Sequence, residues 1–371
     1  MHDRTHVAII GAGLSGLACA YYFKKANIDF TIIESSDAVG GRVRSDKVDG
    51  YILDRGFQVL LTAYPEARNI LDYDKLKLKS FIPGSLIRFH GNFHTIADPW
   101  RRPGDSLKTV FNPIGSFKDK MLIDKVRRSV TEGGLSELYA RPEKTTLKLL
   151  EEYGFSADMI DRFFRPFFGG VFFDKNLTTS SKMFEFTFRM FSTGDTSLPA
   201  NGMSEIPMQM LDLIGSDHVR LNTSVDKVRD NEVVLASGEV IKANAVVVAT
   251  EGPEAGRLLG RAMSTQMRST RCLYYSADKS PLDSPILVLN GDGVGVINNM
   301  CVPSMVSPSY APPGKSLVSI TVIGRDELPD DGLQNLVTAQ LKEWFGKDVD
   351  NWKHLKTYNI KYGLPDATSP L

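Results

Sequence analysis

Short apolar runs separated by a glycine-rich turn open the chain. Val7-Ala8-Ile9-Ile10 is followed at once by Gly11-Ala12-Gly13-Leu14-Ser15-Gly16, and a second apolar run, from Phe30 to Ile33, ends at Glu34. Between the runs, apolar residues recur at helical spacing, which predicts a helix with one apolar face made of Leu14, Leu17, Ala18, Tyr21 and Tyr22. The second run is rich in β-branched residues, which suit a buried parallel strand. The pattern therefore predicts a strand, helix and strand unit.

The turn between the first strand and the helix has the spacing of a dinucleotide site. Gly11 permits a tight turn, Gly13 lets the backbone approach a pyrophosphate, and Gly16 lets the helix pack closely on the strand. The amides of Leu14 and Ser15 at the helix start are expected to face the phosphates, because the positive end of a helix dipole favours anions. An ordinary strand and helix unit with a chance glycine turn is the alternative.

An acid and a second glycine pair follow this unit. Glu34 lies 18 residues after Gly16, near the spacing at which a carboxylate accepts hydrogen bonds from ribose hydroxyls, and an acid there disfavours NADP. Beyond Ser35, the pair Gly40-Gly41 exposes backbone amides and Arg42 adds a charged donor fork. This loop is expected to bind the pyrophosphate from its other side. The alternative interpretation is a solvent-exposed turn that binds no ligand.

With these residues the chain resembles the flavoprotein amine oxidase superfamily, which includes monoamine oxidases, protoporphyrinogen oxidases and phytoene desaturases. In that superfamily, Gly-Gly-Arg after the ribose acid marks FAD as the cofactor. By the resemblance, Gly56, Phe57 and Gln58 pass beside the flavin ring, Val225 presents its backbone to the adenine, and Thr250 closes over the cofactor. Three further segments look like family segments, with Asn201 where a glycine usually stands: Gly91 to His94, Arg165 to Val171, and Leu198 to Met203.

The rest of the chain completes an α/β fold class. Short strands are predicted from Val219 to Thr223, at Val233 to Leu235 and at Val240-Ile241, and the apolar run from Ala245 to Thr250 predicts a buried parallel strand. The expected architecture is a Rossmann-like FAD-binding domain, residues 1–60 and 200–261, with an inserted α+β substrate domain, residues 61–199 and 262–371. An amphipathic helix is predicted from Met121 to Val130.

The composition of the chain limits the kinds of molecule that it is expected to bind and the compartment in which it is expected to lie. The 371 residues include 44 basic and 44 acidic side chains, so nothing favours nucleic acid. The cysteines Cys19, Cys272 and Cys301 show no paired spacing, and no apolar run reaches the roughly 20 residues of a membrane span. The start of the chain does not look like a signal peptide, so we expect a cytoplasmic protein, soluble or in peripheral contact with a membrane. His90 and His94 flank a hairpin signal, and no metal site is expected.

Six phenylalanines lie within eleven residues, at Phe163-Phe164, Phe167-Phe168 and Phe172-Phe173. Core packing is one interpretation of this cluster, and the wall of an apolar substrate tunnel or a membrane-docking patch is the other. No acid–base pair stands out, so the catalytic residues stay unknown. This absence is expected where a flavin carries the chemistry.

The resemblance implies hydride transfer from a substrate C–H to flavin. The substrate would be a small molecule, either an amine or, as the matches after Gly91 favour, an apolar one. A non-catalytic flavin binder is the alternative. The family's last strand, glycine–acid turn and helix are not recognisable from Asp366 onward, so a C-terminally shortened flavoprotein with an unpaired sheet edge is expected.

Overall fold

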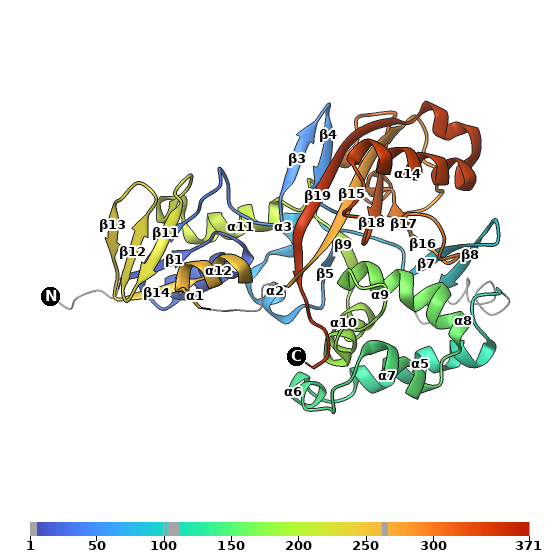
Figure 1. The fold of residues 1–371 in the computed structure, drawn as a ribbon, viewed down its shortest axis with the longest axis horizontal. Helices are drawn as coiled ribbons and strands as arrows, with labels where there is room; N and C mark the ends of the chain where they lie inside the picture. The colour runs from blue at the N-terminus through green and yellow to red at the C-terminus, as the bar shows by residue number, and fades with distance from the viewer. Residues whose placement is uncertain (1–5, 99–100, 102–111, 262–265, 371) are drawn as a thin grey trace. The chain divides into compact units, whose positions relative to one another are not determined.

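The computed structural model describes residues 6–98, 101, 112–261 and 266–370, and the contacts within it divide the chain into two compact units (Figure 1). Unit 1 consists of Met1–Asp46, Pro65–Lys77 and Asn201–Gln266. Unit 2 consists of Lys47–Tyr64, Leu78–Ala200 and Met267–Leu371. Both units mix helices with strands, and each is described by itself below.

Two segments of more than ten residues are assigned differently from the division expected from the sequence, and the remaining differences are boundary shifts at residues 200 and 262–266. Residues 47–60, expected in the first domain, belong to unit 2, where the Tyr51 hydroxyl contacts Ser276 Oγ at 2.5 Å. Residues 65–77, expected in the second domain, belong to unit 1, where Tyr22 donates a hydrogen bond to Glu66 at 2.6 Å. Both assignments depend on contacts between residues far apart in the sequence, which local patterns do not carry.

A four-stranded parallel sheet, in the order β10-β2-β1-β14, forms the centre of unit 1. The predicted strand, helix and strand are all present, since α1 follows β1 directly and β2 pairs with β1 along its whole length. The bounds of these elements are β1 His6–Ile10, α1 Leu14–Lys25, β2 Asp29–Ile33, β10 Val219–Arg220 and β14 Ala245–Val248.

The remaining elements of unit 1 surround this sheet. A three-stranded antiparallel sheet, β11-β12-β13, follows β10, and its side chains Val225, Val233 and Leu235 share a core with Ala8, Ile10 and Ile33. Helix α11 packs against α1, and α12 packs against β11. The bounds are α2 Pro65–Ile70, α3 Tyr73–Leu76, α11 Glu205–Ile214, β11 Val225–Arg229, β12 Glu232–Leu235, β13 Val240–Lys242 and α12 Gly252–Leu259.

Two expectations for unit 1 are wrong in detail. In α1 the buried residues are Gly16, Leu17 and Ala20, whereas Leu14 and Tyr22 are 36% and 43% exposed, so the helix is rotated relative to the expected apolar face. The rotation follows from the close approach of Gly16 to the backbone of the turn before the helix. Strand β14 is parallel as expected but only half-buried, because it stands at the edge of the described sheet.

A seven-stranded mixed sheet, in the order β19-β15-β18-β17-β16-β7-β8, organises unit 2. Its neighbours are antiparallel except β16 and β7. Helix α14, Asp330–Phe345, buries Leu333, Val337 and Leu341 in a core with Leu273, Val318 and Ile320 of the sheet. The strands are β7 Gly84–Phe89, β8 Asn92–Ala97, β15 Met267–Ala277, β16 Leu287–Asn290, β17 Ile297–Cys301, β18 Ser316–Val322 and β19 Lys353–Pro365.

A helical layer lies beside the β7 and β8 end of this sheet (Figure 1). It consists of α5 Phe117–Thr131, α6 Leu135–Tyr139, α7 Thr146–Tyr153, α8 Ala157–Met159, a π-helical turn Ile160–Phe164, α9 Arg165–Phe172 and α10 Ser181–Thr193. The amphipathic helix predicted from Met121 to Val130 is confirmed as part of α5. Its start is set by a capping box, in which Ser116 Oγ accepts from the Asp119 amide and the Asp119 carboxylate accepts from the Ser116 amide.

The phenylalanine cluster packs inside this helical layer. Phe164 and Phe168 are fully buried in a core that includes Leu150, Met159 and Phe184. The rings of Phe168 and Phe184 lie 4.7 Å apart, and those of Phe164 and Phe155 are also 4.7 Å apart. These contacts support the core-packing interpretation of the cluster.

Smaller elements complete unit 2. They are β4 Tyr51–Asp54, β5 Leu60–Leu61, β6 Lys79–Ser80, β9 Thr196–Leu198 and α13 Pro303–Val306, whereas β3 Ser45–Val48 crosses the boundary between the units. The predicted hairpin at Gly91 is confirmed, with His90 and Gly91 at the turn between β7 and β8. Among the described residues, no helix is both long and apolar enough to span a membrane.

Candidate functional site

The glycine turn of unit 1 is built as its sequence predicts. Gly11 has φ +102°, and a Cβ there would lie 2.9 Å from the carbonyl oxygen of Ala249. A Cβ on Gly16 would lie 2.0 Å from the carbonyl oxygen of Gly11, so only glycine allows this contact between helix and turn. At Gly13, by contrast, a Cβ would meet nothing within 4 Å, and φ is an ordinary −69°.

The N-terminus of α1 lacks a side-chain cap. Gly13 occupies the N-cap position and makes no capping hydrogen bond from a side chain. Leu14 and Ser15 in the first turn are exposed, and the first amides of a helix have no partner within the helix. Open space at Gly13 therefore adjoins a set of N–H groups at the positive end of the helix dipole, which suits an anion.

The second glycine pair lies against this turn. The Gly40 amide donates to the Ala12 carbonyl at 2.8 Å, and a Cβ on Gly41 would come within 3.2 Å of Gly13 Cα. Both glycines have positive φ, at +110° and +56°. Gly41 and Arg42 are exposed, and the contact of Gly41 with Gly13 places the backbone of this loop beside the helix start.

Glu34 is buried and held by its own surroundings. Its Oε2 accepts a hydrogen bond from the Ala12 amide at 2.7 Å, and its Oε1 accepts from Ser36, at 2.8 Å from the amide and 2.7 Å from the hydroxyl. The backbone of Glu34 is also paired with β10, since its amide donates to the Arg220 carbonyl at 2.9 Å. A carboxylate has about four acceptor positions, so Oε2 retains capacity for a further donor such as a ribose hydroxyl.

Ser36 was not singled out from the sequence. The expected neighbour, Ser35, is exposed, and its hydroxyl lies 3.5 Å from Glu34 Oε1, at the limit of a hydrogen bond. Ser36 instead orients the carboxylate through two hydrogen bonds. The sequence carried no clear signal for this contact, because the turn in which a side chain accepts from the amide two residues further on is typical of Asp and Asn rather than Glu.

Val225 and Thr250 belong to the same unit as this turn. Thr250 Cγ2 lies 3.4 Å from the position that a Cβ on Gly11 would occupy, so the structure brings Thr250 to the glycine turn. Val225 is buried in the core between β11 and the parallel sheet, and its carbonyl accepts a hydrogen bond from Arg257 Nη2 at 2.9 Å.

Gly56, Phe57 and Gln58 lie in unit 2, in a tight turn after β4. Gly56 has φ +99°, and a Cβ there would lie 2.5 Å from Ile360 Cδ1. The Phe57 ring packs edge-on against Phe81, with centroids 6.0 Å apart, and Gln58 Nε2 lies 3.4 Å from the Arg55 carbonyl oxygen. The turn is therefore closely packed within unit 2.

A buried polar network supports this turn, with Tyr274 in β15 of the large sheet and Tyr310 in a short 3-10 helix, Pro308–Tyr310. The Tyr274 hydroxyl donates to the Asp54 carbonyl, and the Tyr310 hydroxyl donates to Asp54 Oδ2, each at 2.9 Å. Burial, with nearby ionisable groups as a further cause, raises the pKa of both tyrosines well above 10.0. Burial likewise raises the pKa of Cys272 to about 11, so this thiol is protonated at neutral pH.

The residues of unit 1 fit a dinucleotide. A pyrophosphate suits the uncapped helix N-terminus, the open space at Gly13, and the exposed Gly41 and Arg42. A ribose suits Glu34. Among the described residues, no group of three or more His, Cys, Asp or Glu side chains is arranged to hold a metal ion.

Solved structures of other proteins share this fold. An oxidoreductase from Methanosarcina mazei superposes with a TM-score of 0.73 over 97% of this chain and 89% of its own, at 19% identity. A putative protoporphyrinogen oxidase from Exiguobacterium sp. 255-15 gives a TM-score of 0.70 over 98% of this chain and 88% of its own, at 16% identity. The α/β fold class predicted from the sequence is thereby confirmed.

Sequence similarity points to one family. Protoporphyrinogen oxidase 2, chloroplastic/mitochondrial, of Arabidopsis thaliana is 29% identical over 176 residues, which are 44% of this chain and 32% of the plant protein. The chain thus aligns with less than a third of the length of this relative. The family model for flavin containing amine oxidoreductases matches residues 14–370. The resemblance recognised in the sequence is confirmed: the chain belongs to the flavin containing amine oxidoreductase family, and its cofactor is FAD.

Proposed function

We propose that the chain is an FAD-dependent oxidoreductase that removes hydride from a C–H bond of a small molecule. When bound, the flavin supplies the hydride acceptor. Unit 1 is proposed as the FAD-binding part and unit 2 as the part that binds substrate. Family membership and the fit of the glycine turn to a dinucleotide support this proposal.

The single observation that carries the proposal is the contrast among the glycines of the turn. Gly11 and Gly16 are tightly packed against backbone, whereas the Cβ direction of Gly13 is open. Because Gly13 has an ordinary φ, its lack of a side chain is not needed by the fold. The lack of a side chain there is explained by the close approach of a ligand, and the uncapped helix start indicates that the ligand is an anion.

The proposed roles of the chain's own groups follow from their positions. The amides of Leu14 and Ser15 and the loop of Gly40, Gly41 and Arg42 would hold the pyrophosphate. Glu34, oriented by Ser36, would accept a ribose hydroxyl through Oε2. Thr250 beside Gly11 and the backbone of Val225 are proposed as further cofactor contacts, and Gly56, Phe57 and Gln58 as contacts of the flavin ring.

The substrate is proposed to be either an amine or an apolar ring compound. The names of the relatives support both classes, since they include a protoporphyrinogen oxidase and a probable flavin-containing monoamine oxidase A. For the location we propose the cytoplasm, which suits the free thiols of Cys19, Cys272 and Cys301.

Titration of the apoprotein with FAD tests cofactor placement. Gly13→Ala should weaken FAD binding by about 1–3 kcal/mol, because the added methyl group occupies the open space. Gly134→Ala is a matched control, since Gly134 is also an uncapped N-cap residue with extended backbone and room for a Cβ. Equal FAD affinity in all three proteins would refute this placement.

A second experiment separates an enzyme from a flavin binder without turnover. The FAD-loaded chain is mixed anaerobically with candidate amines and porphyrinogens, and the visible flavin absorbance is followed. Bleaching by a substrate supports the oxidoreductase. Full FAD occupancy without bleaching by either class would favour the non-catalytic alternative.

A further inference from the structure

The outer face of α5 combines exposed apolar side chains with basic ones. Phe117 and Met121, one helical turn apart, are 63% and 62% exposed. Lys118, Lys125 and Arg128 are also exposed, and the helix carries five basic residues against two acidic ones, Asp119 and Asp124. We call the side chains of Phe117, Lys118, Met121, Lys125 and Arg128 the α5 surface.

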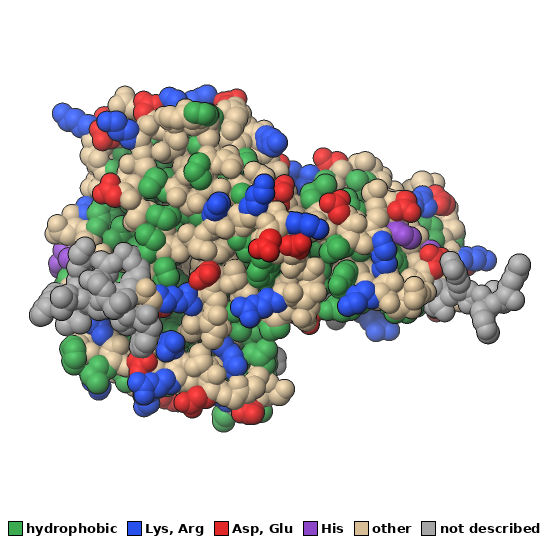
Figure 2. Space-filling model, turned by 180° about the vertical axis from the view of Figure 1, so that it is seen from behind, with side chains coloured by type: hydrophobic (Ala, Val, Ile, Leu, Met, Phe, Trp, Pro, Cys, Tyr) green, Lys and Arg blue, Asp and Glu red, His purple; other side chains and the backbone are tan. Residues whose placement is uncertain are grey.

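The inner face of the same helix is fully used by the core. Val126 and Val130 are buried with Ile114, Leu150 and Phe155 in the helical layer of unit 2. Phe117 and Met121 therefore do not belong to the hydrophobic core and are exposed on the opposite face of the helix. Figure 2 shows hydrophobic and basic side chains next to one another on the helical part of unit 2, at the lower left.

The acidic residues of the helix neutralise only one of the three cations of this surface, Arg128. Asp119 is buried and accepts hydrogen bonds from Ser116 and Ser156. Asp124 forms an ion pair with Arg128. Within the described residues, neither Lys118 nor Lys125 forms an ion pair, although Lys125 Nζ lies 5.9 Å from the centroid of the Tyr153 ring. Two cations without a carboxylate partner therefore remain beside the two apolar side chains.

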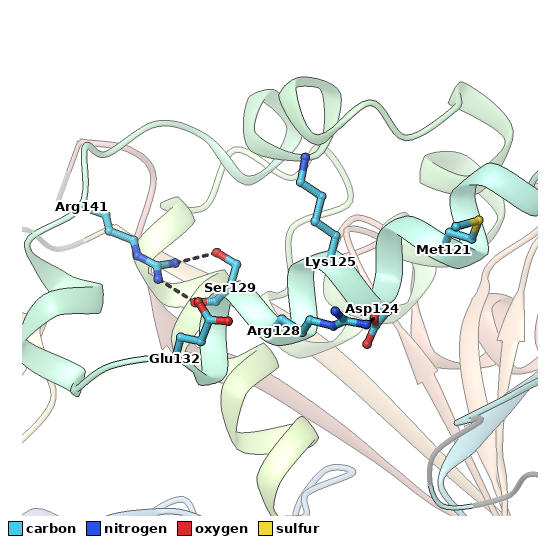
Figure 3. A pocket seen from close by; sticks show the side chains of 7 residues that line it. All are labelled: Met121, Asp124, Lys125, Arg128, Ser129, Glu132 and Arg141. Carbon is cyan, nitrogen blue, oxygen red and sulfur yellow. Dashed lines mark hydrogen bonds and ion pairs between the residues drawn. The ribbon is translucent and has the colours of Figure 1, made fainter.

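A shallow pocket of about 430 Å³, largely open to solvent, continues the α5 surface along the helix (Figure 3). It is lined by Met121, Asp124, Lys125, Arg128, Ser129, Glu132 and Arg141. Arg141 is held by its own contacts, to Glu185 at 2.5 Å and to the Ser129 carbonyl at 2.6 Å. Asp124 Oδ1 is buried and accepts no hydrogen bond from the described residues, so it could take one from a hydroxyl or ammonium group of a ligand.

We propose that the α5 surface docks on the surface of an anionic phospholipid bilayer. Phe117 and Met121 enter the interface between head groups and acyl chains, and the basic side chains lie at the level of the lipid phosphates. The pocket beside Arg128 accommodates the polar part of one head group. A helix that displays aromatic or aliphatic side chains among cations has the composition of an interfacial segment.

A second copy of the chain is a poorer partner for this surface. In a symmetric dimer the same patch meets itself, which would place Lys118 and Lys125 near their own copies. Two exposed apolar side chains also cover far less than the roughly 800 Å² per partner of a stable interface. A small soluble anion would leave Phe117 and Met121 exposed to water.

Vesicle co-sedimentation of the full chain tests the proposal. Wild type should bind vesicles of equal parts phosphatidylcholine and phosphatidylglycerol, should bind phosphatidylcholine vesicles weakly, and should be released by high salt. Lys118→Gln with Lys125→Gln should lower the partition coefficient about 30-fold. Phe117→Ser with Met121→Ser should lower it by about tenfold or more.

Two matched control pairs show whether the effect belongs to this surface. Val294→Ser with Leu336→Ser removes exposed apolar side chains elsewhere in unit 2, and Lys47→Gln with Lys279→Gln removes exposed cations there. Both should bind like wild type. Equal losses in the control and test pairs, or wild type that stays in the supernatant with anionic vesicles, would overturn the proposal.

A fluorescent variant keeps the test valid if a double variant fails to fold. Phe117→Trp should shift its emission to the blue with anionic vesicles, whereas Val294→Trp should not. No shift in Phe117→Trp would count against docking. Sedimentation velocity tests the remaining partner, a second copy of the chain. If wild type is a dimer, the dimer is lost in Phe117→Ser, and wild type does not bind vesicles, then the α5 surface is a dimer interface instead.

Discussion

Tyr310 donates a hydrogen bond to the carboxylate of Asp54 at 2.9 Å, although the two residues are 256 positions apart in the chain. Both side chains are buried, and Tyr274 donates to the backbone carbonyl of the same aspartate. Two phenols thus hold the end of β4, immediately before the turn that contains Gly56. Since a buried carboxylate is stable only when its oxygens are hydrogen-bonded, this contact is important to unit 2.

Replacing Tyr310 by phenylalanine should destabilise the chain by about 1–3 kcal/mol, because a buried carboxylate oxygen loses a donor while the ring volume is kept. Urea unfolding measures the change. Tyr139→Phe, at a 41% exposed position, is the control and should stay within about 0.5 kcal/mol of wild type. Equal stability of Tyr310→Phe and wild type would show that the hydrogen bond contributes nothing.

The buried phenols and thiol should also make the fold sensitive to alkali. Burial raises the pKa of Cys272 from 9.0 to about 11 and raises those of Tyr274 and Tyr310 well above 10.0. A group whose pKa is raised in the folded state stabilises the fold below its unfolded pKa, and that contribution is lost as the pH rises. Unfolding free energy should therefore fall above about pH 9. The fall should be smaller in Tyr274→Phe with Tyr310→Phe, and an identical pH profile would contradict this assignment.

Asp174 should make the stability of the fold sensitive to acid. Its burial raises the pKa, but hydrogen bonds from Thr179 and the contact with Arg268, at 3.0 Å, outweigh burial and lower the pKa below 3.8. A carboxyl group whose pKa is lowered in the folded state stabilises the fold above its unfolded pKa, and this contribution is lost as the pH falls through that region. Asp174→Asn should show a flatter acid limb in urea unfolding. Asp278→Asn, at an exposed ion pair with Lys315, is the control and should leave the limb unchanged.

Truncating Phe168 distinguishes the two interpretations of the phenylalanine cluster. Its side chain is 1% exposed, stacks on Phe164 and packs at a tilt against Phe184, so Phe168→Ala should cost about 3–5 kcal/mol of stability. Phe117→Ala, at an exposed position, should cost far less. A Phe168→Ala protein of unchanged stability but altered substrate preference would support a substrate tunnel instead.

The two glycines of the turn in unit 1 should separate folding from binding. Gly16→Ala should destabilise the chain strongly, because its Cβ would lie 2.0 Å from the Gly11 carbonyl oxygen. Gly13→Ala should lower the thermal midpoint of the apoprotein far less, since the new methyl group meets no atom within 4 Å and only the poorer N-cap preference of alanine, about 1 kcal/mol, opposes it. Thermal unfolding of both apoproteins measures this contrast. A loss in Gly13→Ala as large as that in Gly16→Ala would mean that Gly13 serves the fold rather than a ligand.

The local architecture of the chain could be predicted from its sequence because spacing alone governs it. The apolar runs and glycine turn predicted β1, α1 and β2, and the hairpin at Gly91 followed from turn chemistry. The Gly-Gly-Arg after Glu34 carried the resemblance to the family, and the family model confirms that resemblance. These features depend on residues close together in the chain.

Tertiary structure decided what depends on contacts between distant residues. Residues 47–60 belong to unit 2 through contacts such as Tyr274 with Asp54, and the buried face of α1 is set by the contact of Gly16 with the turn. Likewise Ser36, rather than Ser35, orients Glu34. Hydrophobic periodicity indicates how much of a helix or strand is buried. Which neighbouring element buries it depends on long-range packing, and a single sequence carries no local signal for the identity of that neighbour.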